Sequence, residues 1–320
     1  MGRRAMSQTE RTRLWRERAR HGLVGRTRAG FELLPPITLP AGNTITIIVG
    51  DCRDVLPTLG RASIDSTVTS PPYFALRDYG GGPKAIGLQP TVAGYAAHLV
   101  DVFRLVRPVL RDTGTAWLNL GDCFCTAPPG NAPNTTALSS GLPNSIANQE
   151  MRRAAQVLVD KTKLAGLKPK DLIGIPWEVA FALRDDGWYL RSEVIYSKPN
   201  PTPESTRDRP TLSHEQVFLL TKSPRYYWDA AAIRERNRNR CSVWTIPKQI
   251  VRGHSAVFPE ALVERCILAG CPPGDTVLDP FGGIGTVGLV AGRLGRNAVL
   301  IELNRSYAEL ARQRIEDQTR

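Results

Sequence analysis

Residues that bind metals or form disulfides are scarce in this sequence, and they are scattered. The 320 residues include six cysteines and four histidines, and no two cysteines have Cys-x-x-Cys spacing. Zinc sites and disulfide frameworks need such residues at short, regular spacings. The sequence therefore predicts no metal site and no disulfide, and reduced thiols favour an intracellular protein.

Long apolar segments are also absent. No apolar run in the sequence approaches the roughly 20 residues that a membrane-spanning helix needs. The first 30 residues are basic and lack the apolar core of a secretory signal. A hydrophobic fraction of 42% still supports a substantial core. We expect a soluble, cytoplasmic protein without a membrane partner.

Negative charge is in deficit, with 42 Lys and Arg against 30 Asp and Glu and a net charge of +12. The first 30 residues hold nine arginines and two glutamates, so they alone carry +7. Such an excess favours a polyanionic partner, nucleic acid above all. For this segment a solvated arm that contacts nothing is the alternative. We interpret residues 1–40 as a basic, flexible N-terminal arm.

Extended and helical patterns alternate along the rest of the chain. Residues 44–49 and 297–303 form apolar or β-branched runs, and residues 306–316 have helical periodicity. Such alternation predicts an α/β fold with a doubly wound, mostly parallel sheet, in one catalytic domain over residues 41–320. Residues 125–150 are rich in Pro, Gly, Asn, Ser and Thr, which predicts a mobile loop.

A glycine-rich turn, LDPFGGIGTVG, lies near the C-terminus between an extended and a helical pattern. Gly283, Gly285 and Gly288 have the dinucleotide-binding spacing, and Glu302 ends the next extended run. Glycine lets a ligand approach the backbone, and such a carboxylate can accept from a ribose diol. Asp279 before the glycines suits a sulfonium nucleoside better than a pyrophosphate. An NAD-dependent dehydrogenase and a turn that needs glycine only for packing are the alternatives.

A second strand end carries a rigid polar corner, Ser70-Pro71-Pro72-Tyr73. A nucleobase exocyclic amine is a poor nucleophile because its lone pair is delocalised into the ring. The Ser70 hydroxyl and the Pro71 carbonyl are two acceptors that can draw its N–H groups toward tetrahedral geometry. Tyr73, with Phe74 beside it, can stack on a base flipped out of the duplex. A Pro-Pro loop with an incidental aromatic residue is the alternative.

These two motifs resemble those of the amino-methylating DNA methyltransferases, which modify N4 of cytosine or N6 of adenine with S-adenosyl-L-methionine. TSPPY is similar to their catalytic motif, LDPFGGIGT is similar to their cofactor motif, and this order is that of the family's β class. The resemblance implies a Rossmann-like methyltransferase fold with permuted motif order. It assigns catalysis and base binding to Ser70, Pro71, Pro72 and Tyr73, and cofactor binding to Asp51, Phe258, Pro259, Asp279, Phe281, Gly283, Gly285, Thr286 and Glu302.

Serine at the first position of the catalytic motif is typical of N4-cytosine enzymes, so we favour cytosine and keep N6-adenine as the main alternative. RNA or protein methyltransferases more usually carry Asn-Pro-Pro-Tyr. The sequence lacks the Pro-Cys pair of C5-cytosine enzymes, because Cys271 precedes its proline. A DNA-binding protein with an inactive site and an NAD-dependent dehydrogenase are the alternatives from other classes.

A base-flipping enzyme must bind phosphates on both sides of its target in double-stranded DNA. Arginines alternate at positions 234, 236, 238 and 240, where they can read guanine or form a solvated loop. We expect target recognition within residues 199–253, with the 125–150 loop as a clamp. The protein is expected to be prokaryotic or phage-encoded and nucleoid-associated, and a companion restriction endonuclease is left open. Predicted DNA contacts are Arg77, Lys198, Arg207, Arg209, Arg236 and Arg238.

Overall fold

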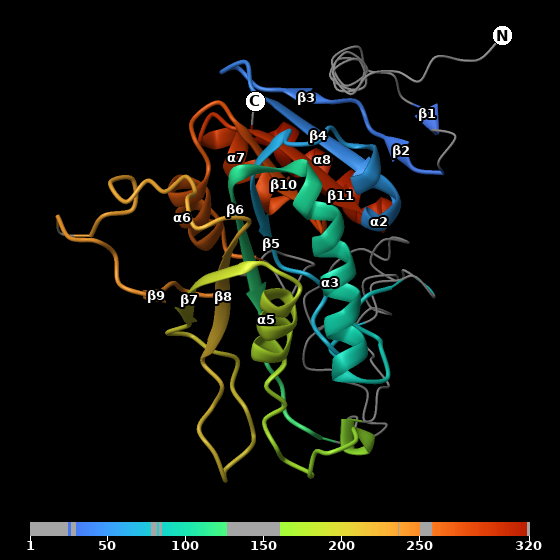
Figure 1. Ribbon diagram of the computed structural model, residues 1–320, viewed down its shortest axis with the longest axis vertical. Helices are drawn as coiled ribbons and strands as arrows, with labels where there is room; N and C mark the ends of the chain where they lie inside the picture. Colours follow the sequence, from blue (N-terminus) through green and yellow to red (C-terminus); the bar gives the residue numbers. More distant parts are fainter. Residues whose placement is uncertain are drawn as a thin grey trace.

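The computed structural model describes residues 25–26, 30–77, 82, 85–126, 161–235, 237–249 and 258–318. Its strands form one sheet in the order β1–β2–β4–β11–β10–β5–β6–β8–β7–β9, with β3 paired to β4 (Figure 1). The strands are β1 (Gly25–Arg26), β2 (Glu32–Leu33), β3 (Ile37–Thr38), β4 (Thr44–Val49), β5 (Ile64–Thr69), β6 (Leu110–Leu120), β7 (Tyr189–Ser197), β8 (His214–Thr221), β9 (Val243–Thr245), β10 (Thr276–Asp279) and β11 (Asn297–Glu302).

The centre of the sheet is parallel, as the sequence predicts. Strands β4, β11, β10, β5 and β6 run in the same direction, and β8 and β7 add an antiparallel extension beyond β6. The prediction of a mostly parallel α/β sheet is therefore confirmed. The helices are α2 (Cys52–Val55), α3 (Val92–Val109), α5 (Ile175–Asp185), α6 (Glu260–Gly270), α7 (Thr286–Arg293) and α8 (Arg305–Asp317).

Helices cover both faces of the sheet, so the fold is doubly wound. Successive strand residues point to opposite faces. Ile48 and Val299 pack with α2, α3 and α5 in one hydrophobic core. Ile47 and Leu300, their neighbours in sequence, pack with α6, α7 and α8 in a second core. Burial on both faces explains why the central strands are apolar almost throughout.

Part of the segment predicted as an N-terminal arm belongs to the sheet. Strands β2 and β3 pair antiparallel with β4, and the side chains of Leu34, Ile37 and Leu39 are buried. The predicted boundary at residue 40 therefore cuts through packed structure, because these apolar residues cover the edge of β4. Residues 1–24 and 27–29 of the arm, and residues 127–150 of the predicted loop, lie outside the described residues.

Among the described residues, no helix has both the length and the apolar character that crossing a membrane requires.

Candidate active site

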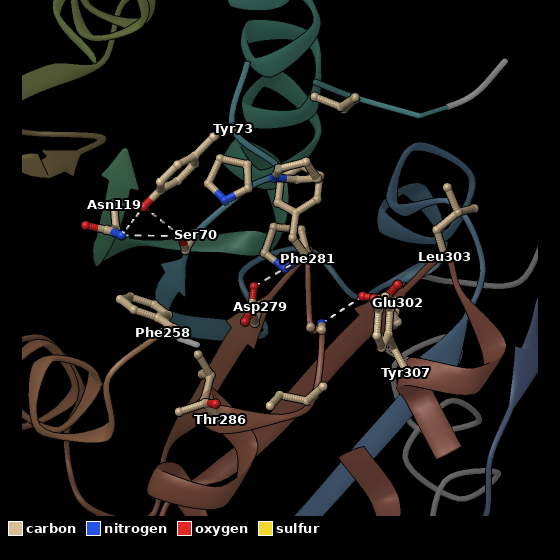
Figure 2. Close-up of a pocket in the computed structure, with 18 of the residues that line it drawn as sticks. Ser70, Tyr73, Asn119, Phe258, Asp279, Phe281, Thr286, Glu302, Leu303 and Tyr307 are labelled. Carbon is tan, nitrogen blue, oxygen red and sulfur yellow. Dashed lines mark hydrogen bonds between the residues drawn. The ribbon is translucent and has the colours of Figure 1, made fainter. Parts of the chain in front are cut away.

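A cavity of about 420 Å³ opens at the carboxyl ends of the central parallel strands. Ser70 and Tyr73 line one end, and Glu302 lines the other (Figure 2). Gly283, whose amide donates to Glu302, also lines the cavity. The topology brings these motifs together, because β5 and β10 are adjacent parallel strands and the loops after them leave the same edge of the sheet. The two motifs singled out in the sequence therefore share one cavity.

Asp279 is buried at the end of β10 between these two motifs. Its Oδ1 accepts hydrogen bonds from the Thr69 hydroxyl at 2.6 Å and from the Phe281 amide at 3.0 Å. Burial, opposed by these two hydrogen bonds, raises the pKa of Asp279 to about 7. A carboxyl group with such a pKa changes charge near neutrality, and it gains most from a ligand that brings a positive charge.

Glu302 ends β11 on the other side of the glycine turn. Its carboxylate accepts the Gly283 amide at 2.7 Å and the Asn304 amide at 2.8 Å. A carboxylate has about four acceptor sites, so capacity remains for ligand hydroxyls. Burial raises the pKa of Glu302. Gly283 has φ of +50°, and a Cβ there would meet no atom closer than the Phe281 carbonyl oxygen at 3.9 Å.

Gly285 was predicted to bind cofactor, but the structure places it behind the cavity wall. It precedes α7 with φ of +80°, and an added Cβ would lie 2.7 Å from the Cβ of Ala311 in α8. Gly288 is also a packing glycine, since its Cβ would lie 2.8 Å from Leu300 Cδ1. Two of the three motif glycines therefore allow helix packing, and Gly283 alone of the three faces the cavity.

The other predicted cofactor residues line the cavity. Phe258 and Thr286 lie on one side of it in Figure 2, and Leu303 and Tyr307 lie beyond Glu302. Asp51, which was expected to accept from an adenine amine, also lines the cavity and caps the N-terminus of α2. Its carboxylate is held by the Arg53 guanidinium at 2.9 and 2.7 Å. The lining also includes Pro259, Phe281, Gly282 and Ile284.

The Ser-Pro-Pro-Tyr corner is held from behind by packing. The Tyr95 hydroxyl donates to the Pro72 carbonyl at 2.9 Å. A Cβ on Gly121 would lie 2.6 Å from Tyr73 Cε2, so only glycine leaves room for the Tyr73 ring. Phe74 was expected to extend the base-binding wall, but it is only 1% exposed and packs on Tyr95 in the core.

A network of side chains that the sequence analysis missed surrounds the Tyr73 hydroxyl. This hydroxyl donates to Glu215 Oε2 at 2.7 Å, and the Asn119 amide donates to the Tyr73 oxygen at 2.6 Å and to Glu215 at 2.9 Å. Ser70 Oγ lies 3.3 Å from the same amide nitrogen. Burial and the neighbouring Glu215 carboxylate raise the pKa of Tyr73. Tyr73 is therefore a neutral hydrogen-bond donor.

A polar residue at position 119 in the otherwise apolar end of β6 was a usable signal for this network. Nothing in the local sequence marks Glu215, because its position depends on the antiparallel pairing of β8 with β6.

The predicted DNA-contact residues are placed unevenly. Arg77 and Lys198 line the cavity, together with Lys248, which the sequence analysis missed. Arg209 is engaged within the protein, because it pairs with Glu204 at 2.6 Å and lies over the Phe124 ring. The Arg209 side chain is therefore held against the protein and does not extend toward a DNA phosphate. Arg207 and Arg238 are exposed, and Arg236 lies outside the described residues.

The arginine-rich segment is a turn rather than the extended row that alternate spacing suggested. The backbones of Glu235 and Arg238 form an isolated antiparallel bridge, and Asn237 between them has φ of +62°. Arg240 turns inward, where its Nε donates to the Ile233 carbonyl at 2.9 Å. Arg234 and Arg238 remain exposed on the turn, while residues 250–253 of the predicted recognition region lie outside the described residues.

Comparisons with known proteins identify relatives over most of the chain. The family model described as DNA methylase matches residues 64–313. The chain is 46% identical to the type II methyltransferase M.SmaI of Serratia marcescens over 277 residues, which are 84% of this chain and 90% of that protein. It is 45% identical to M.Cfr9I of Citrobacter freundii over 281 residues, which are 86% of this chain and 88% of that protein.

Solved structures have the same fold at low sequence identity. The cytosine-N4-specific PvuII DNA methyltransferase has a TM-score of 0.62 and 18% identity, and the match covers 88% of this chain and 94% of that one. M1.HpyAVI in complex with S-adenosylmethionine has a TM-score of 0.54 and 18% identity, covering 84% of this chain and 99% of that one.

Proposed function

The chain belongs to the N6/N4 DNA methylase family, and from this premise we propose that it is a type II modification methyltransferase. It transfers a methyl group from S-adenosyl-L-methionine to the exocyclic N4 amine of a flipped cytosine in double-stranded DNA. One observation carries the proposal: the Ser-Pro-Pro-Tyr corner and the glycine turn line the same cavity. Methyl transfer needs donor and acceptor in contact, and a shared cavity permits this.

The residues at the glycine end fit S-adenosylmethionine, which supplies a methyl group on a positively charged sulfur. Glu302 has acceptor capacity for the ribose hydroxyls, and Gly283 allows the ligand to approach the backbone. We assign the ammonium group of the methionine part to Asp279, whose carboxylate gains from a positively charged ligand. The carboxylates of Asp279 and Glu302 in one cavity would repel a pyrophosphate. This repulsion disfavours the alternative of a nicotinamide dehydrogenase, which the glycine spacing had left open.

We assign activation of the amine to the Ser70 corner. The Ser70 hydroxyl and the Pro71 carbonyl accept the two N–H groups, so the nitrogen lone pair leaves conjugation with the ring and can attack the methyl carbon. The Tyr73 ring, fixed by Glu215 and Asn119, supports the face of the base. After transfer, the proton leaves the methylated amine to water.

Contacts with the duplex flank this cavity. Arg77 and Lys248 at the cavity neutralise phosphates beside the flipped nucleotide, and the exposed Arg207 and Arg238 contact DNA farther out. Residues 199–253 are proposed to read the sequence, with the exposed arginines of the 234–240 turn facing base edges. The basic arm adds phosphate contacts. The names of the type II relatives support a companion restriction endonuclease as a further partner.

Ser70 favours cytosine over adenine, because serine opens this motif in N4-cytosine enzymes. The test is to express the chain in cells without methylation of their own, digest the DNA and identify the modified nucleoside by mass. We expect N4-methylcytosine, and much less of it from the Ser70→Ala variant. N6-methyladenine instead would establish the other member of the family, and unmodified DNA would overturn the proposal.

A further inference from the structure

A row of polar side chains extends the cavity wall from Ser70 across three strands. Three of these side chains project from one face of the sheet: Asn119 of β6, Glu215 of β8 and Tyr196 of β7. Tyr196 is paired with Glu215. Asn119 is paired with Val217, which lies two residues after Glu215 and therefore points to the same face. Lys198 follows two residues after Tyr196. Tyr196, Lys198, Glu215 and Asn119 all line the cavity.

Lys198 and Glu215 form an ion pair inside this wall. Lys198 Nζ lies 2.5 Å from Glu215 Oε1, and each side chain is only 17% exposed. The opposite oxygen of Glu215 holds Tyr73 and Asn119, so the ammonium group is tied to the catalytic corner through a single carboxylate. Burying two charges costs free energy that their attraction often does not recover, so such a pair is better explained by a role than by stability.

The Tyr196 ring packs against the Lys198 ammonium group, with Nζ 5.5 Å from the ring centroid. The tyrosine side chain is 2% exposed, and its hydroxyl makes no hydrogen bond to any described residue. Burial and the nearby Glu215 charge raise the pKa of Tyr196, which keeps the hydroxyl a donor. Lys198, rather than the enclosed Tyr196 hydroxyl, is therefore the donor on this wall that can reach an acceptor in the cavity.

We propose that Lys198 donates to the O2 oxygen of the flipped cytosine and thereby selects cytosine over adenine, with Glu215 as the residue that positions its ammonium group. This inference rests on the proposed function. When the amines and the adjacent ring nitrogens of the two bases are superposed, cytosine presents O2 where adenine presents C2–H. A partly buried ammonium group facing C2–H would lose a hydrogen bond and keep its desolvation cost. Lys198 is therefore a base contact rather than a phosphate contact.

Lys222, which directly follows β8, supplies a matched control. Lys222 pairs with Asp112 at 2.8 Å, its side chain is 16% exposed, and it follows the opposite end of β8. Lys222 does not line the cavity. Lys222→Met therefore removes a lysine of similar burial, with its ion pair, away from the proposed base contact.

The experiment compares two substrates whose target base differs only at the proposed contact region. One duplex carries cytosine, and the other carries the C-linked 2-aminopyridine nucleoside, which keeps the amine and the ring nitrogen but lacks O2. We measure kcat/KM of the wild type, Lys198→Met and Lys222→Met on both. The wild type should exceed Lys198→Met by ~10- to 100-fold on cytosine and should equal it on the analogue within about a factor of two. Lys222→Met should match the wild type on both.

The ratio between substrates removes effects that are common to both. If Lys198 only balances the Glu215 charge, Lys198→Met loses the same factor on cytosine and on the analogue, and the inference is overturned. If this variant fails to bind S-adenosylhomocysteine, the neutral pair Lys198→Met with Glu215→Gln replaces it under the same criterion. Adenine methylation alone would establish the N6-adenine alternative and remove the premise of this inference, whereas cytosine methylation with equal ratios would overturn only this inference.

Discussion

The two ends of the cavity are built in different ways. At the glycine end, Asp279, Phe281 and Gly283 come from one short stretch of chain, and Glu302 follows at the next strand end. At the corner end, Ser70 and Tyr73 depend on side chains from three other strand ends, Asn119, Glu215 and Lys198. A contiguous turn can be read in the sequence, whereas a network from separate strands depends on the whole sheet. The two ends should therefore respond differently to substitution.

Ser70→Ala should have the largest effect and should be confined to the corner end. Removing one acceptor aimed at the reacting amine should lower kcat by roughly 100-fold or more, by analogy with loss of one preorganised hydrogen-bonding group. Affinity for S-adenosylhomocysteine, measured by tryptophan fluorescence, should stay within about twofold of the wild type, because Ser70 holds no group at the glycine end. A parallel loss of cofactor affinity would break the distinction between the two ends.

Glu302→Gln tests the glycine end in the complementary way. The substitution keeps the shape but removes the charge that favours hydrogen bonds from ribose hydroxyls, so cofactor affinity should fall by about 10- to 100-fold. Binding of the target duplex without cofactor, measured by fluorescence anisotropy, should be unchanged. An equal loss of affinity for DNA and for cofactor would contradict the separation of the cavity into a cofactor end and a base-binding end.

The pH dependence of cofactor binding sharpens the same division. Asp279 has a pKa of about 7 in the cofactor-free protein, so it is neutral below that pH and cannot attract the methionine ammonium group. Affinity for S-adenosylhomocysteine should therefore fall by up to about tenfold per pH unit below 7. Calorimetry between pH 5.5 and 8.5 would measure this. Asp279→Asn should remove most of this dependence, and an unchanged dependence in that variant would contradict the assignment to Asp279.

In the cofactor-free protein, ionisation of Asp279 has the opposite effect: it lowers stability as the pH rises. The folded-state pKa of Asp279 lies above the ordinary value of about 3.9. Its contribution is therefore complete below about pH 4 and is lost as the pH rises through 7. Asp279→Asn should accordingly raise the melting temperature at pH 8 more than at pH 5, provided that Thr69 still finds a partner.

Gly285→Ala should have the smallest effect on function and should separate packing from ligand contact within the glycine turn. The new Cβ would crowd Ala311 at 2.7 Å in a backbone with φ of +80°, which should destabilise the fold by about 1–3 kcal/mol. Cofactor affinity of the folded fraction should change little. Gly283→Ala is the control, because its Cβ would enter the cavity and lower affinity with a smaller loss of stability.

Most of the fold and the glycine end could be predicted from the sequence. Apolar β-branched runs and helical periodicity are local signals, and Asp279, Gly283 and Glu302 stand at strand ends where ligands of parallel sheets bind. Local spacing did not separate ligand glycines from packing glycines, because Gly285 owes its identity to Ala311 in another helix. Glu215 and the inward turn of Arg240 depend on strand pairing and loop shape, to which nearby residues give no clue.

Strands β10 and β11 lie between β4 and β5, so these two early strands are joined only through the last two strands of the chain. The Thr69–Asp279 hydrogen bond spans 210 residues of chain. During translation from the N-terminus, the centre of the sheet therefore stays open until its final segment leaves the ribosome, and closing so long a loop is entropically costly. A nascent or C-terminally truncated chain carries the Ser-Pro-Pro-Tyr corner but no place for a methyl donor, which makes completion of synthesis a condition of activity.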